Sequence, residues 1–132
     1  MYLSDQDFIH QFEQKTLPLD EFNHRGHLRL AWLYLQKYSL QLAIKKITKG
    51  IEAFAVSLGA NDKFHHTLTE AIVRIMYRRC QKGEVKTFEK FLQTNPDLVN
   101  NIIDLVHIYY SNDRLNSEIA KREFVFPDIK SF

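Results

Sequence analysis

Residues 22–38 read FNHRGHLRLAWLYLQKY, and their spacing predicts a helix. Leu28, Ala31 and Leu35 recur at intervals of three and four residues, which places them on one helical face. Asn23 stands before this run and is a residue type that caps helix N-termini well. The stretch therefore predicts an amphipathic helix that begins after Asn23 and turns its apolar face toward a core.

The same periodicity continues through most of the chain. Ser4 and Ser39 are placed to cap two further helices, and Gly59 is of the type that often follows a helix end. The last third divides into shorter helical segments, and FVF at residues 124–126 is the strongest, though weak, strand candidate. The sequence predicts an all-α protein, a compact single-domain bundle of five to seven helices over residues 1–132.

Composition limits the classes of function. A hydrophobic share of 45% and a charged share of 26% are ordinary for a soluble globular protein. The net charge of +2 argues against nucleic acid or an anionic membrane as partner. Cys80 is the only cysteine, so no intrachain disulfide is expected, and no apolar run reaches the roughly 18 residues of a membrane span. The expected location is the cytoplasm, and the expected partner is a small molecule or a metal ion.

Basic residues gather at two places with helical spacing, and such groups are typical of a solvated helix face. The two groups are Lys45, Lys46 and Lys49, and Arg74, Arg78, Arg79 and Lys82.

Two histidines stand at the start of the predicted helix. With a turn of about 100° per residue, His24 and His27 fall at the N-terminal end of the core-facing stripe. Gly26 falls on another face, and glycine there weakens the helix by up to about 1 kcal/mol relative to alanine. Close approach of a backbone or a ligand would explain this glycine, and so would simple exposure.

The stretch KFHHTLTEA at residues 63–71 repeats the arrangement. The same turn places His65 inside an apolar arc, with Thr69 beside it, whereas His66 and Glu70 are rotated toward the outer face. Three inward histidines in the opening turns of long helices are thus predicted.

These stretches resemble a family of small bacterial helical proteins of unassigned function. Its pattern runs F-x-H-x-x-H-x-x-x-A and later K-[FY]-H-x-T-x-T, and the likeness extends over about residues 20–128. The resemblance implies a site made of His24, His27, His65, Thr67 and Thr69, and implies no reaction. The matching residues of the tail are Ser111, Leu115, Ser117, Ala120, Phe124, Pro127 and Asp128.

The first hypothesis is a divalent metal site of His24, His27 and His65. Three neutral imidazoles with one open position suit zinc, iron, nickel or copper. The three side chains are then expected to lie within about 10 Å of one another. Carboxylates near the same helix starts could complete the shell: Asp20, Glu21 and Asp62.

Three alternatives remain open, one of them a binding module with an exposed groove for a peptide helix or nucleic acid. Because helix N-termini repel cations and attract anions, the site could instead hold a small polar or anionic ligand. Arg25, Thr67 and Thr69 would then donate hydrogen bonds, and an enzyme of this kind would use His65 or His24 as general base. In the third alternative the histidines are structural and join adjacent helix starts through loop carbonyls.

Overall fold

The computed structural model describes residues 2–83 and 85–132, and it confirms the all-α prediction. These residues form nine α-helices and one 3-10 helix, with no strand among them. The helices exceed the predicted five to seven because the last third splits into pieces of four to seven residues. The chain divides into two compact units with their boundary between Phe64 and His65. The single domain expected over the whole chain stays a prediction.

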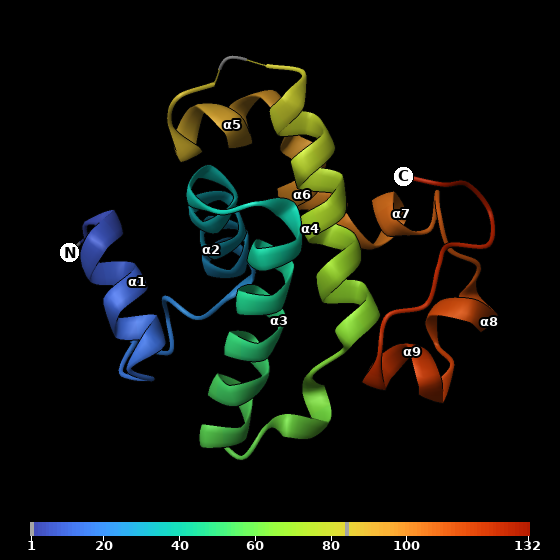
Figure 1. The fold of residues 1–132 in the computed structure, drawn as a ribbon, viewed down its shortest axis with the longest axis horizontal. Coiled ribbons are helices and arrows are strands. Elements are labelled where there is room, and N and C mark those ends of the chain that lie inside the picture. Colours follow the sequence, from blue (N-terminus) through green and yellow to red (C-terminus); the bar gives the residue numbers. More distant parts are fainter. Residues whose placement is uncertain (1, 84) are drawn as a thin grey trace. The chain divides into compact units, whose positions relative to one another are not determined.

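The first unit contains α1 (Asp5–Glu13), α2 (His24–Lys37), α3 (Leu40–Ser57) and the 3-10 helix η1 (Asn61–Lys63), as Figure 1 shows. Each α-helix begins where a polar side chain accepts a hydrogen bond from a backbone N–H of the first turn. The capping residues are Ser4, Asn23 and Ser39, as the sequence predicts.

Aromatic rings fill the space between α1 and α3. Phe12 and Phe54 are buried and stack with their ring centroids 6.0 Å apart. Gly50 of α3 makes this approach possible, because a Cβ there would lie 2.7 Å from the Phe12 ring. Gly50 therefore lets the Phe12 ring lie directly against the backbone of α3.

The helices α1 and α3 end in the same hydrogen-bond pattern. In α3, Gly59 has a φ of 71° and follows the C-cap Leu58, which confirms the predicted stop. In α1, Lys15 takes the equivalent left-handed position with a φ of 61°. Both ends form the six-residue loop of a Schellman motif, in which the second residue after the C-cap donates to a carbonyl five positions earlier.

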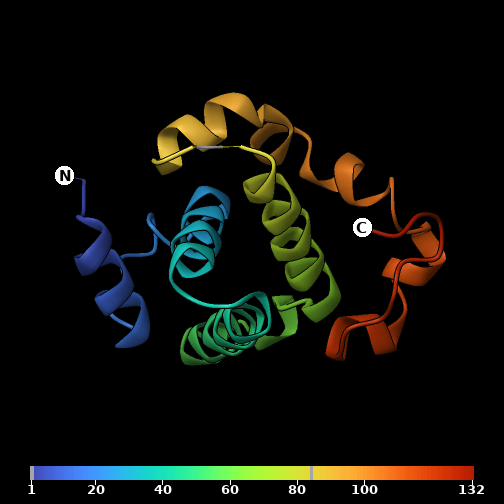
Figure 2. The ribbon, with the colours of Figure 1, turned by 45° about the horizontal axis from the view of Figure 1, so that its top comes forward.

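The second unit is built on one long helix, α4 (His66–Gln81), which contacts α7 and α9. The remaining helices are short and follow one another along the chain, as Figure 2 shows. They are α5 (Phe88–Thr94), α6 (Pro96–Asn100), α7 (Ile102–Val106), α8 (Asn112–Leu115) and α9 (Glu118–Arg122).

Side chains hold the C-terminal segment of the second unit, residues 123–132, which we call the tail. The Thr67 hydroxyl donates to the Glu123 carbonyl over 2.8 Å and accepts from the Val125 N–H over 3.1 Å. The Tyr110 hydroxyl donates to the Val125 carbonyl over 2.6 Å. Residues 124–126 therefore form no strand, since the backbone groups of Val125 bond to side chains instead of to a neighbouring strand.

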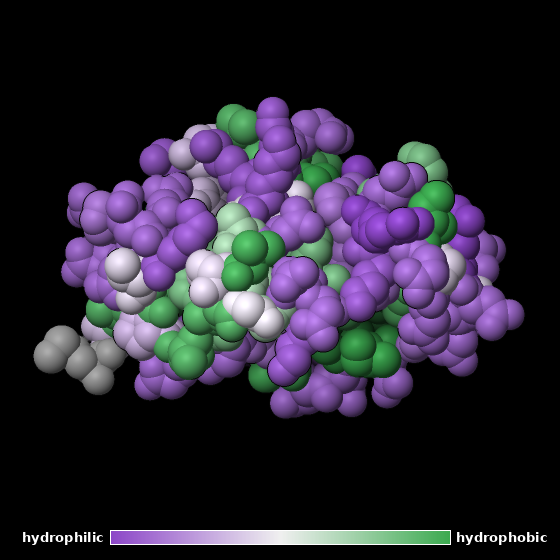
Figure 3. Space-filling model, turned by 90° about the horizontal axis from the view of Figure 1, so that it is seen from below, coloured by the Kyte–Doolittle hydropathy of each residue, from purple (hydrophilic) through white to green (hydrophobic). Residues whose placement is uncertain are grey.

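The molecular face drawn in Figure 3 is mostly hydrophilic, with hydrophobic side chains in separate patches. Leu19 and Leu58 of the first unit are among the exposed apolar side chains, at 65% and 45% exposure. Within residues 2–83 and 85–132, no helix is both long enough and apolar enough to span a membrane.

Candidate functional site

The start of α2 is fixed by backbone contacts around Gly26. The Asn23 side chain accepts a hydrogen bond from the Gly26 N–H over 2.9 Å and donates to the Asp20 carbonyl over 2.7 Å. A Cβ on Gly26 would collide with the carbonyl oxygen of Glu21. Close backbone approach, one of the two explanations considered for this glycine, is thus the reason for it. This contact holds the first turn of α2 against the segment that precedes it.

His27 lies against aromatic rings. Its imidazole meets the Phe22 ring edge-to-face at 4.5 Å between centroids, and Phe22 in turn stacks on Phe54 at 4.1 Å. The His27 Nε2 atom is buried and has no hydrogen-bond partner among the described residues. Leaving a buried polar atom unsatisfied costs about 1–3 kcal/mol, so this atom is an unusual feature of the first unit.

A pocket of the first unit opens beside this imidazole. It has a volume of about 280 Å³, and apolar side chains make most of its wall. His27 and Lys63 are the two ionisable side chains that line it. The other lining residues are Leu19, Phe22, Ile51, Ala55, Leu58, Ala60 and Phe64.

Burial keeps His27 uncharged at neutral pH. Loss of hydration, and to a smaller extent the nearby charge of His24, lower the pKa of its imidazole to about 4. The His27 imidazole that lines the pocket is therefore neutral, and its Nε2 either donates or accepts one hydrogen bond, according to its tautomer.

His65 has a different role from the one expected for an opening-turn residue. It is the N-cap of α4 and has extended backbone angles, so the helical rotation used to place it does not apply. Its Nδ1 accepts from the Leu68 N–H over 3.0 Å, and its Nε2 lies 2.8 Å from the Leu115 carbonyl. The two bonds together require the tautomer with the proton on Nε2. A metal ion could bind this ring only after one of these bonds had broken.

The predicted donor residues are mostly engaged by the chain itself. Thr67 is fully buried and holds the tail, as described above. The Thr69 hydroxyl donates to the backbone carbonyl of His65 over 2.8 Å, not to its imidazole. Arg25 lies exposed in the first turn of α2. Arg25, which belongs to the same unit as the pocket beside His27, is not among the residues that line it.

Sequence periodicity missed a buried charged group on α4. Glu70, expected on the outer face, is only 6% exposed, and it lies 2.9 Å from Arg74 and 3.1 Å from His66. The Arg74 guanidinium also lies over the Phe124 ring, 4.8 Å from its centroid. The expectation for Glu70 was wrong because the tail covers this side of the helix, which no local pattern reveals.

The sequence-predicted histidines divide between the two units. His24 and His27 belong to the first unit and His65 to the second, so their convergence in one pocket stays a prediction. Within either unit, the described residues contain no group of three or more His, Cys, Asp or Glu side chains placed to hold a metal ion.

Comparisons with protein-family models, with curated proteins and with solved structures find no match to this chain.

Proposed function

We propose that the first unit binds a small, mainly apolar molecule in the pocket beside His27, with one polar group of the ligand bonded to the imidazole. The observation that carries this proposal is the buried Nε2 atom of His27, which has no partner among the described residues. A ligand group that reaches this atom recovers the cost of about 1–3 kcal/mol for an unmet hydrogen bond.

The wall of the pocket supports an apolar ligand body. Small-molecule sites are mostly apolar, with few polar groups that fix orientation, and their volumes range from roughly 300 to 1,000 Å³. The volume of about 280 Å³ lies at the lower end of this range. Leu19 and Leu58 are exposed at the pocket, and burying them against a ligand would remove apolar surface from water.

A matched pair of ligands tests the proposed hydrogen bond. We would titrate the protein with 2-naphthol and with naphthalene, which share a ring system and differ by one hydroxyl. A hydroxyl both donates and accepts, so it serves either tautomer of His27. We expect 2-naphthol to bind about five- to tenfold more tightly than naphthalene, since a neutral hydrogen bond contributes about 1 kcal/mol. Chemical-shift changes in a two-dimensional amide NMR spectrum would report both affinity and location.

The variant His27→Phe keeps a flat ring against Phe22 and removes the nitrogen. In this variant the preference for 2-naphthol should vanish, whereas naphthalene should bind as before. His10→Phe is the matched control, because His10 is exposed on α1 outside the pocket. Equal affinities for both ligands in the parent protein would refute the proposed role of His27.

A divalent metal ion such as zinc, iron or nickel is the second candidate ligand. The specific observation in its favour is that His24 and His27 stand one helical turn apart and interact electrostatically. Two imidazoles are half of the four ligands that zinc usually takes, so this candidate ranks second. Elemental analysis of chelator-free protein beside a His24→Ala/His27→Phe variant tests it. Stoichiometric metal in the parent alone would favour the metal site.

A further inference from the structure

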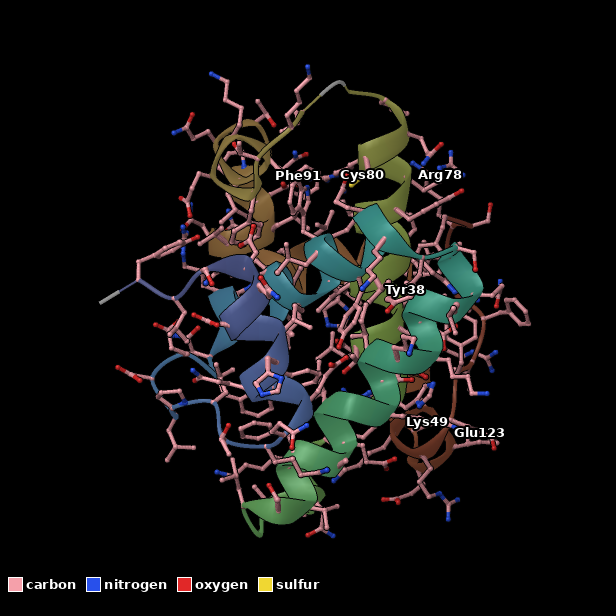
Figure 4. The ribbon with its side chains drawn as sticks, turned by 60° about the vertical axis from the view of Figure 1, so that its left-hand side comes forward. Tyr38, Lys49, Arg78, Cys80, Phe91 and Glu123 are labelled. Atoms are coloured by element: carbon pink, nitrogen blue, oxygen red, sulfur yellow. The ribbon has the colours of Figure 1, made fainter. Side chains whose placement is uncertain are left out.

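We propose that the second unit has an anion site for small molecules with two or more phosphate groups. The site is a hollow of about 460 Å³ at the C-terminal end of α4, and it is independent of the pocket beside His27. Four cationic side chains line it: Arg78, Arg79, Lys82 and Lys130. Arg78 lies in the last turn of α4, and its side chain points away from that of Cys80 (Figure 4).

The positive charge of the hollow exceeds what the chain neutralises. Asp97 is the one carboxylate that the described residues pair with these four cations, through Arg79, at 2.6 and 2.8 Å. Lys82 and Lys130 pair with no carboxylate among the described residues, so at least these two positive charges of the hollow are available to an anion. Such a concentration attracts multivalent anions more strongly than monovalent ones, because each added charge adds a Coulomb interaction.

Helix stabilisation does not explain this whole cluster. Cations in the last turn of a helix complement its dipole, and this accounts for Arg78 and Arg79. Lys130 lies in the tail, beyond the last helix, and still lines the same hollow. A basic residue brought from the tail to a helix end that already has several cations is better explained by a shared anionic ligand.

The two guanidinium groups are held in place before any ligand arrives. Arg79 makes a two-pronged bond to Asp97 and a further bond of 3.2 Å to the Asn95 side chain. Arg78 donates to the main-chain oxygen of Phe132 over 2.8 Å. Guanidinium groups match phosphate oxygens in geometry, and fixing them in advance reduces the entropy lost on binding. Lys82 and Lys130 are exposed, so they are free to move onto the anion.

An aromatic pair lines the same hollow. The Tyr109 and Phe132 rings lie 5.0 Å apart between centroids, and both residues belong to the lining. Aromatic rings contact the faces of nucleobases favourably. A nucleoside polyphosphate and an inorganic polyphosphate both have the phosphate groups that the cations recognise. Only the nucleoside polyphosphate has a base that can contact the rings.

Calorimetric titration with inorganic tripolyphosphate and with ATP tests the site. We expect saturable binding of tripolyphosphate that weakens at high salt, as interactions between exposed charges do. The variant Lys82→Gln/Lys130→Gln should bind about tenfold more weakly, since it removes two of the positive charges that attract the anion. These lysines make no side-chain hydrogen bond among the described residues, so the variant should fold normally.

The control variant Lys90→Gln/Lys121→Gln removes the same charge from exposed positions outside the hollow. It should bind tripolyphosphate within about twofold of the parent. Tighter binding of ATP than of tripolyphosphate would assign nucleotides to the site, and equal or weaker binding of ATP would assign inorganic polyphosphates. Absence of saturable binding, or equal losses in both double variants, would overturn the proposal.

Discussion

The first unit buries the Nε2 atom of His27 without a partner among the described residues, whereas the second unit bonds both ring nitrogens of His65. The difference comes from backbone position. His65 precedes α4 in an extended conformation, from which its ring reaches the Leu68 N–H. His27 is already inside α2, where a ring cannot fold back onto the N–H groups of its own turn and is directed to Phe22 instead.

The role of a histidine near a helix start therefore depends on its position relative to the first helical residue, and a difference of a few residues changes that role. The lone pair of a capping imidazole accepts a hydrogen bond from a backbone N–H, and this bond stabilises the helix. An imidazole one turn further on keeps its nitrogen for another partner and costs stability until that partner binds. The binding role that we propose therefore falls to His27, whereas the two hydrogen bonds of His65 stabilise the fold.

The contrast between the two histidines predicts a dependence of stability on pH, which is the largest effect that we expect. The His27 imidazole titrates near pH 6.5 when the chain is unfolded and near pH 4 when it is folded. Between these values the unfolded state binds more protons, so acidification favours unfolding. The stability present above pH 6.5 should fall by up to about 3 kcal/mol as the pH drops through 4.

Urea unfolding of the parent and of His27→Phe across this pH range checks the prediction. The variant should lose less stability on acidification, because phenylalanine has no proton to bind. At pH 7 it should be as stable as the parent or more so, because it removes an unsatisfied buried atom. Parallel pH profiles for the two proteins would show that His27 is not buried uncharged, and the contrast with His65 would disappear.

Local signals in the sequence were sufficient for much of the fold and for one part of the site. Asn23, Ser39 and Gly59 mark helix ends because capping depends on neighbours within four residues. The direction of His27 followed from periodicity for the same reason. Thr67 could not be placed in this way, because its hydroxyl bonds a tail segment 56 and 58 residues away.

The burial of Glu70 and the unpartnered state of the His27 Nε2 atom also had no local signal. Both depend on which side chains from distant positions surround the group. Glu70 lies between His66 and Arg74, on a helix side that the tail reaches through Phe124. Periodicity shows which face of a helix is apolar, and it does not show which polar side chain a distant segment will cover.

Thr67, another motif residue of the second unit, also stabilises the fold through hydrogen bonds of its side chain. Replacing it with valine keeps the side-chain shape and removes both bonds to the tail, which leaves the buried Val125 N–H without its acceptor. We expect the free energy of unfolding of Thr67→Val to fall by about 2–3 kcal/mol. Urea unfolding measures this change.

Thr69→Val is the matched control for that experiment. The Thr69 hydroxyl bonds only the carbonyl one turn earlier in its own chain segment, so its loss should change stability by less than about 0.5 kcal/mol. Similar losses in both variants would mean that the tail contact of Thr67 contributes little, and that the second unit does not depend on its motif residues for stability.

A further prediction concerns His65 itself. His65→Ala removes the cap of the Leu68 N–H and the bond to the Leu115 carbonyl, and should lower the free energy of unfolding by about 2 kcal/mol. His65→Asn keeps a side-chain acceptor suited to capping and loses only the Leu115 bond, so it should lose about 1 kcal/mol. Urea unfolding of both variants at pH 7 separates the contributions of the two ring nitrogens. If His65→Ala were as stable as the parent, the nitrogens of His65 would be as available to a ligand as the Nε2 of His27, and assigning fold stabilisation to one histidine and binding to the other would fail.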